Sequence, residues 1–137
     1  MYELKYDEHS VTAKFTGGPI ATTENIERRN VKLIVGFDRN KKVVSITVFD
    51  PPRHSSPKGS LHPFFAPEYD VKADALGLNL TPAPHRQAAL DSLEVWPDFV
   101  VDFDGNERVV GLEFLNASTW FSGEMLQEFN SRPQIAM

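Results

Sequence analysis

The sequence contains no cysteine. Without thiols the chain has no disulfide framework, no thiolate nucleophile and no cysteine-based zinc or iron–sulfur site. It also has no apolar run that approaches the roughly 18 residues needed to span a membrane. The segment from Met1 to Asp7 has neither the basic region nor the apolar region of a signal peptide. We therefore expect a cytoplasmic protein with no membrane partner.

Hydrophobic residues make up 41% and aromatic residues 11% of the 137 positions, a composition that argues against wholesale disorder. The length fits one ordinary domain, or two very small ones that share a core. Folding such a chain buries roughly two thirds of its unfolded surface, enough for a core without disulfides.

The net charge of −5 is the sum of two halves with opposite charge. Residues 1–59 carry 10 Lys and Arg against 7 Asp and Glu, whereas residues 60–137 carry 4 against 12. Six cations form a candidate basic patch: Arg28, Arg29, Lys32, Arg39, Lys41 and Lys42. Such a patch can contact phosphates, but no aromatic platform accompanies it and the whole chain is acidic. Charge complementarity between the halves or between chains is the rival interpretation, and nucleic-acid binding is disfavoured.

An internal repeat is the strongest pattern in the sequence. Residues 31–50 match residues 97–116 at a constant offset of 66 without a gap, and Tyr6-Asp7 returns as Tyr69-Asp70 at an offset of 63. In both long segments apolar residues alternate with period two on either side of a polar turn, which predicts a β-hairpin. We interpret the chain as a tandem duplication whose first copy has diverged.

Each copy also opens with a shorter predicted hairpin, over residues 2–15 and 64–80. Residues 22–29 and 85–93 are expected to be short helices or loops. The predicted fold is therefore α+β and β-rich, with two pseudo-equivalent antiparallel four-stranded repeats. Ser118 or Ser122 is expected to cap a short C-terminal helix with Met125, Leu126 and Phe129 on one side.

The predicted organisation places the first repeat at residues 1–50, a proline-rich connector at 51–67, and the second repeat with the helix at 68–137. The connector holds five of the ten prolines, which favour an extended chain. We expect the two repeats to pack as one globular unit. Because the predicted sheets are apolar on both faces, each needs cover from a helix, the other repeat or a partner chain, and a homodimer through sheet faces is one candidate arrangement.

The second copy resembles a known bacterial family, the domain of unknown function 2283. The matching features are the Tyr69-Asp70 start and the Val109-Val110-Gly111-Leu112-Glu113 strand that leads to Asn116-Ala117-Ser118. The resemblance covers residues 64–122 well and residues 1–50 weakly, where Ser45-Ile46-Thr47 replaces Gly-Leu-Glu. It implies a small β-rich domain, often encoded near small toxin-like proteins, without established catalytic residues.

No metal site or cofactor is expected from the remaining motifs. Asp102, Asp104, Asn106 and Glu113 have the spacing of a calcium loop, but Glu107 stands where that loop needs glycine, and the flanks are strands. A hairpin turn is the favoured interpretation. The four histidines, His9, His54, His62 and His85, form no pair at helical ligand spacing.

The function favoured by the sequence is a non-catalytic protein-interaction module, in its most specific form an antitoxin-like partner of a small protein. No arrangement of residues typical of catalysis is present, and exposed charge of both signs is expected. The alternative is a small-ligand-binding protein or enzyme with a pocket between the repeats. Its candidate ligand-binding residues are Phe64, Phe65, His85 and Trp96.

Overall fold

Two antiparallel five-stranded sheets make up most of the computed structural model, which describes residues 2–15, 18–28, 31–50, 53–55, 61–63, 65–81, 91–105 and 107–131. The strands of the first sheet are Glu3–Tyr6 (β1), Ser10–Lys14 (β2), Thr22–Arg28 (β3), Val31–Phe37 (β4) and Val43–Phe49 (β5). Those of the second are Ala66–Asp70 (β8), Ala75–Asn79 (β9), Asp91–Trp96 (β10), Phe99–Phe103 (β11) and Val109–Leu115 (β12). A separate short hairpin pairs Arg53–Ser55 (β6) with Leu61–Pro63 (β7).

The two sheets have the same strand order. The first runs β1-β2-β5-β4-β3 and the second β8-β9-β12-β11-β10. Their irregularities also coincide, because the register shifts between Gly36 and Phe37 in β4 and between Asp102 and Phe103 in β11, at the predicted offset of 66. The structure thus contains two similar halves, as the repeat predicted, and their origin by duplication stays a prediction.

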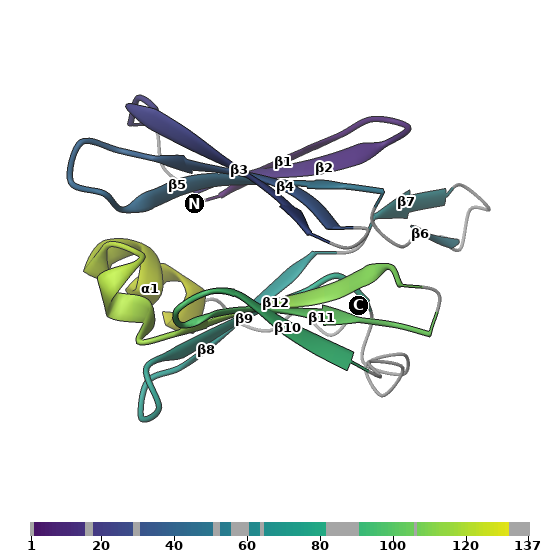
Figure 1. The fold of residues 1–137 in the computed structure, drawn as a ribbon. Helices are drawn as coiled ribbons and strands as arrows, with labels where there is room; N and C mark the ends of the chain where they lie inside the picture. Colours follow the sequence, from purple (N-terminus) through teal and green to yellow (C-terminus); the bar gives the residue numbers. More distant parts are fainter. Residues whose placement is uncertain are drawn as a thin grey trace.

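The sheets lie one above the other, and their connections leave at opposite ends (Figure 1). The helix Gly123–Ser131 (α1) follows β12 at one end, whereas the β6–β7 hairpin follows β5 at the other. The β6–β7 hairpin therefore lies at the end of the sandwich opposite α1.

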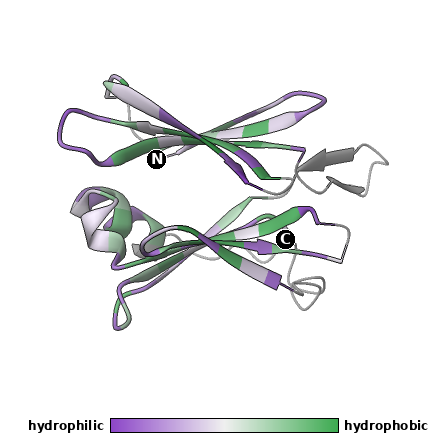
Figure 2. Cartoon of the chain, in the orientation of Figure 1, coloured by the Kyte–Doolittle hydropathy of each residue, from purple (hydrophilic) through white to green (hydrophobic). Residues whose placement is uncertain are grey.

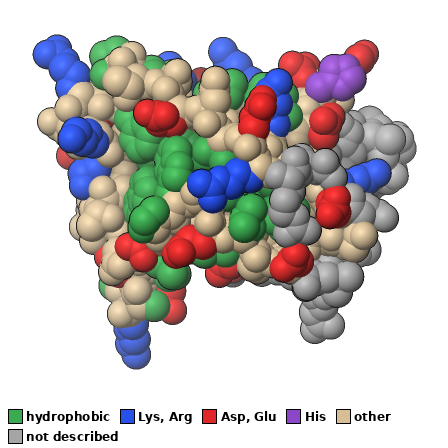
Figure 3. Space-filling model, viewed as in Figure 1, with side chains coloured by type: hydrophobic (Ala, Val, Ile, Leu, Met, Phe, Trp, Pro, Cys, Tyr) green, Lys and Arg blue, Asp and Glu red, His purple; other side chains and the backbone are tan. Residues whose placement is uncertain are grey.

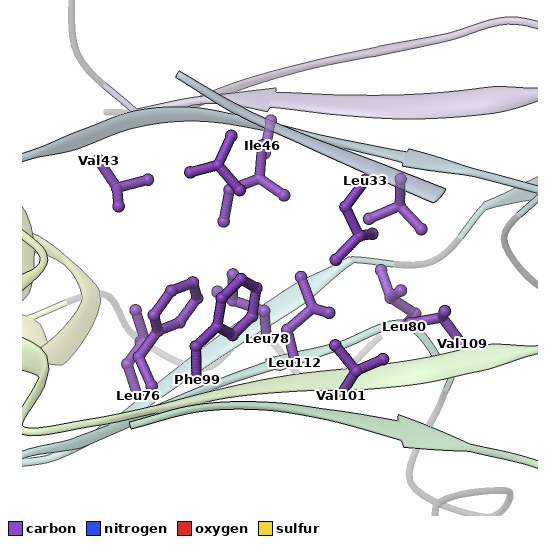
Figure 4. Close-up of a cluster of buried hydrophobic side chains, with 14 of the residues drawn as sticks. Leu33, Val43, Ile46, Leu76, Leu78, Leu80, Phe99, Val101, Val109 and Leu112 are labelled. Atoms are coloured by element: carbon purple, nitrogen blue, oxygen red, sulfur yellow. The ribbon is translucent and has the colours of Figure 1, made fainter. Parts of the chain in front are cut away.

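The inner faces of the sheets form the hydrophobic core. Strand positions that alternate along the sequence converge there, including Leu33, Ile46, Leu76, Leu112 and Val101 (Figure 4). Figure 2 shows hydrophobic segments along both sheets and hydrophilic residues toward the turns. The core residues from both halves are only 0–6% exposed, so each half serves as the cover that the other half needs.

Five strands per sheet, instead of the predicted four, is the main correction. Thr22–Arg28, expected to be a short helix or loop, forms the edge strand β3, and Asp91–Trp96 forms β10. Only Ile26 of β3 is buried, so this strand lacks the apolar alternation on which the prediction depended. Residues 85–90 of the second expected segment lie outside the described residues.

The predicted C-terminal helix is confirmed as α1. Ser122 Oγ accepts a hydrogen bond from the backbone N–H of Met125 at 3.2 Å, the geometry of an N-cap. A 3₁₀ turn, Ala117–Thr119, precedes the helix. Met125, Leu126 and Phe129 are buried, so α1 closes one end of the sheet sandwich. No helix among the described residues is long and apolar enough to cross a membrane.

Candidate functional site

The outer face of the second sheet carries an uneven distribution of charge. Strand register places Glu68, Gly77, Glu113, Val100 and Glu94 in one row across β8, β9, β12, β11 and β10. The next row reads Ala66, Asn79, Gly111, Asp102 and Ser92. Four of these ten residues are acidic and none is basic. We call this surface, defined by Glu68, Glu94, Asp102 and Glu113, the acidic face.

Two carboxyl groups of the acidic face interact directly. Hydrogen bonding to Asp102, partial burial and the negative charge of Asp102 together raise the pKa of Glu113 to about 7. Ser92 Oγ donates a second hydrogen bond to Asp102 Oδ1 at 2.5 Å. Near neutral pH the pair therefore shares one proton for much of the time.

A glycine makes room for this pair on the neighbouring strand. A Cβ atom on Gly111, which lies opposite Asp102, would stand 3.4 Å from Asp102 Oδ2. In the first half the roles are exchanged: Gly36 lies opposite Ser45, and a Cβ on Gly36 would collide with Ser45 Oγ. Each half thus has one glycine and one polar side chain at this position.

The first sheet shows that the fold does not require an acidic outer face. The row that corresponds to Glu68 through Glu94 reads Lys5, Thr12, Thr47, Ile34 and Asn25. There the Thr12 and Thr47 hydroxyls are hydrogen-bonded at 2.8 Å. The acidic face is therefore a property of the second half alone.

The residues that begin and end the resemblance meet in a hydrogen-bonded cluster. Asp74 accepts hydrogen bonds from Tyr69 Oη at 2.7 Å and from Ser118 Oγ at 2.6 Å. These donors, Ser118 first, lower the pKa of Asp74, whose backbone φ is 50°. The backbone oxygen of Asp74 also accepts from Ala117 N at 2.8 Å. The cluster fixes the turn after β12 to the β8–β9 hairpin, which is a structural role.

The structure describes two of the four residues predicted to line a pocket, and these two lie in separate aromatic groups. Trp96 is half-buried and stacks on Trp120, with ring centroids 6.0 Å apart and planes at 3°. Phe37 lies 6.2 Å from Trp96, and we call Phe37, Trp96 and Trp120 the tryptophan strip. Phe65 instead contacts Tyr2, at 5.6 Å, in a separate aromatic group. Phe64 and His85 lie outside the described residues.

Packed side chains occupy the centre of the space between the sheets, where the described core residues are at most 6% exposed. Figure 3 shows hydrophobic side chains reaching the surface between the sheets, in the left half of the view. A pocket in the described part of the chain would therefore have to lie at the rim, where the tryptophan strip is half-buried.

The structure separates the residues of the predicted basic patch. Arg28 and Lys32 flank the β3–β4 connection, whereas Arg39, Lys41 and Lys42 belong to the turn at the other end of β4. Arg29 lies outside the described residues. Lys42 Nζ donates hydrogen bonds to the backbone oxygens of Ser118 and Thr119 at 3.0 and 3.3 Å, so this cation connects the two halves.

The residues with calcium-loop spacing do not form one site. Asp104 Oδ1 accepts from Arg108 N at 2.9 Å inside the β11–β12 hairpin turn, whereas Asp102 and Glu113 lie on the sheet. Asn106 lies outside the described residues. Among the residues that the structure does describe, no group of three or more His, Asp or Glu side chains is placed to hold a metal ion.

We expect the stability of the protein to fall as the pH rises from about 5 to just above neutrality. The folded chain keeps a proton on Glu113 up to about pH 7, whereas the unfolded chain loses it near 4.5. The stabilisation is complete below the lower value and is lost through the higher one. After allowance for solvent screening we expect a loss of about 1 kcal/mol between about pH 5 and pH 8.

Urea unfolding at a series of pH values measures this loss. Glu113→Gln is the informative variant, because its amide donates to Asp102 at every pH and should flatten the profile in this range. A wild-type profile that is already flat would contradict the proton-sharing pair.

Part of the chain is similar to a known protein family. Residues 68–118 match a family described as a protein of unknown function, DUF2283. The matched segment includes the acidic face and the Asp74 cluster and excludes the first half. No curated protein and no solved structure matches the chain significantly. The family description assigns no activity, so the function must be argued from the surface itself.

Proposed function

We propose that the protein is a cytoplasmic, non-catalytic protein-interaction module, and specifically an antitoxin-like partner of a small protein. The observation that carries this proposal is the difference between two outer faces on the same sheet topology. The inner faces of both sheets are buried in the shared core, and only the outer face of the second half is acidic. A surface that differs while the scaffold stays the same fits a role in recognition.

A homodimer through sheet faces would have to use the outer faces, since the inner faces already pack within the chain. The net charge of −5 opposes the self-association of two acidic faces. The proposal therefore favours a different protein as the partner, with the acidic chain as one half of a charge-complementary complex.

Affinity capture of the tagged full chain from its native host, followed by chemical cross-linking, tests this function. We expect one small protein to be recovered in amounts equal to the chain and to elute with it in gel filtration. Recovery of the chain alone, as a monomer in both experiments, would contradict the proposal.

A second candidate function, small-ligand binding, is favoured by the tryptophan strip. Trp96 and Trp120, the only two tryptophans in the chain, are half-buried and stacked there, as in sites that bind flat ligands. Tryptophan fluorescence therefore reports on this rim alone. A saturable change with a fraction of host metabolites, together with no captured protein, would favour the ligand-binding alternative.

A further inference from the structure

We propose that the acidic face is the docking surface for a basic protein segment, one that presents Lys or Arg side chains beside at least one apolar side chain. This inference rests on the proposed function and specifies the surface and the chemistry of the partner. Four features of the described residues support it: the charge pattern, the exposed apolar side chains, the glycine beside Glu113, and the contrast with the first sheet.

The charge pattern favours a cationic partner. Glu68, Glu113 and Glu94 lie in one row and Asp102 in the next, with no Lys or Arg in either row. Asp102 and Glu113 lie on neighbouring strands, where two like charges destabilise a sheet once Glu113 is ionised. A Lys or Arg side chain placed between them removes the repulsion and forms charge-assisted hydrogen bonds. An anionic partner, such as nucleic acid or acidic lipid, would be repelled.

Apolar side chains on the same face offer anchoring points. Leu115 follows Glu113 by two residues on β12, points to the same side and is 41% exposed. Val100, directly opposite Glu113, is half-buried. A surface that combines exposed aliphatic groups with charges of one sign has the mixed composition of a protein interface.

Gly77 leaves the backbone of this face partly uncovered, whereas the backbone at Gly111 is buried. Gly77 and Gly111 sit inside β9 and β12, and neither adopts a left-handed φ. The nearest atom to a Cβ on Gly77 would be the backbone oxygen of Glu68 at 3.9 Å, an ordinary contact distance. Internal packing therefore does not demand a glycine there, and glycine inside a strand costs stability. A bare backbone beside Glu113 instead allows another chain to approach closely.

The first sheet is an internal comparison for these features. At the positions of Gly77 and Glu113 it has Thr12 and Thr47, whose hydroxyls bond to each other. At the position of Glu68 it has Lys5. The same scaffold thus forms with a row that holds one lysine, no acidic residue and a bonded pair of hydroxyls, so folding does not require the acidic row of the second half.

Nuclear magnetic resonance titration of the full chain with a defined probe tests the docking surface. The probe is a short acetylated peptide of alternating lysine and valine, and its control is the same peptide with glutamate in place of lysine. We expect the lysine peptide to shift the amide signals of Gly77 and Gly111 and to leave that of Gly36, on the first sheet, in place. The glutamate peptide should shift none of them.

Paired variants separate a specific surface from general attraction. E94Q/E113Q should weaken binding of the lysine peptide by about tenfold at low salt and at about pH 8, where Glu113 is ionised and the variant removes two charges at the contact. E3Q/E24Q removes two exposed charges from the first half and should stay within about twofold of wild type. Gly77→Val keeps every charge but covers the bare backbone, and we expect about fivefold weaker binding.

The proposal is overturned if E94Q/E113Q binds the peptide as tightly as E3Q/E24Q, or if the shifts appear at Gly36 instead. Its failure is distinguishable from failure of the proposed function. A natural partner that binds E94Q/E113Q and wild type equally would leave the interaction role standing and place it on another surface. Recovery of no natural partner would remove the role itself.

Discussion

Phe114→Ala is expected to lower the free energy of unfolding by about 4 kcal/mol, because it removes a large side chain from the centre of the shared core. Phe114 is fully buried, and its ring centroid lies 4.3 Å from that of Phe99 and 5.0 Å from that of Phe121. The resulting cavity would lie in the inner layer that joins the second sheet to the helix end. Equilibrium unfolding in urea, monitored by circular dichroism, measures the loss.

The adjacent residue supplies the matched control for this variant. Leu115 is on the same strand but points to the outer face and is 41% exposed. Leu115→Ala should therefore cost less than about 1 kcal/mol. Equal losses in the two variants would show that the assignment of inner and outer faces in β12 is wrong.

Gly36→Ala is expected to destabilise the protein by about 1–3 kcal/mol, the usual cost of forcing extra volume into a packed site. The added methyl group would collide with Ser45 Oγ and stand 3.2 Å from Ile20 Cδ1. Both neighbours must then move, and Ser45 is itself buried. Thermal unfolding of the variant beside wild type measures the effect.

Two further variants identify the cause of this loss. The double variant G36A/S45A removes the colliding oxygen, so most of the stability should return if the collision is the cause. Gly77→Ala meets no close atom and should be neutral, or stabilise by up to about 1 kcal/mol. Destabilisation by Gly77→Ala as large as that by Gly36→Ala would contradict the conclusion that the acidic face has room for a side chain at position 77.

Period-two alternation predicted the central strands because these strands bury one face in the core. Val31 to Phe37 and Phe99 to Phe103 alternate clearly, and both form strands at the predicted places. The edge strand β3 escaped prediction because only Ile26 of its seven residues is buried. Its β-branched Thr22 and Thr23 were a weak signal of a strand that alternation could not register.

The acidic pair is harder to find in the sequence, because Asp102 and Glu113 are separated by a turn. Their spacing resembles a calcium loop, but the flanking strands and Glu107 at the glycine position do not fit such a loop. The predicted hairpin already implies that Asp102 and Glu113 lie close together. Once its turn is placed at Asp104 to Glu107, strand register brings Asp102 next to Gly111 and one step from Glu113. The raised pKa of Glu113 depends on that contact and on partial burial, which only the structure provides.

Expression of the two halves as separate chains tests the central claim, a single core shared by two similar sheets that leaves the acidic face free. Residues 1–55 and 60–137 would be produced together in one cell and purified through a tag on the first. We predict that they co-purify in equal amounts, and that the second chain alone self-associates or aggregates because its inner face is apolar. A second chain that is a stable monomer alone, with its own cooperative unfolding transition, would contradict the shared core.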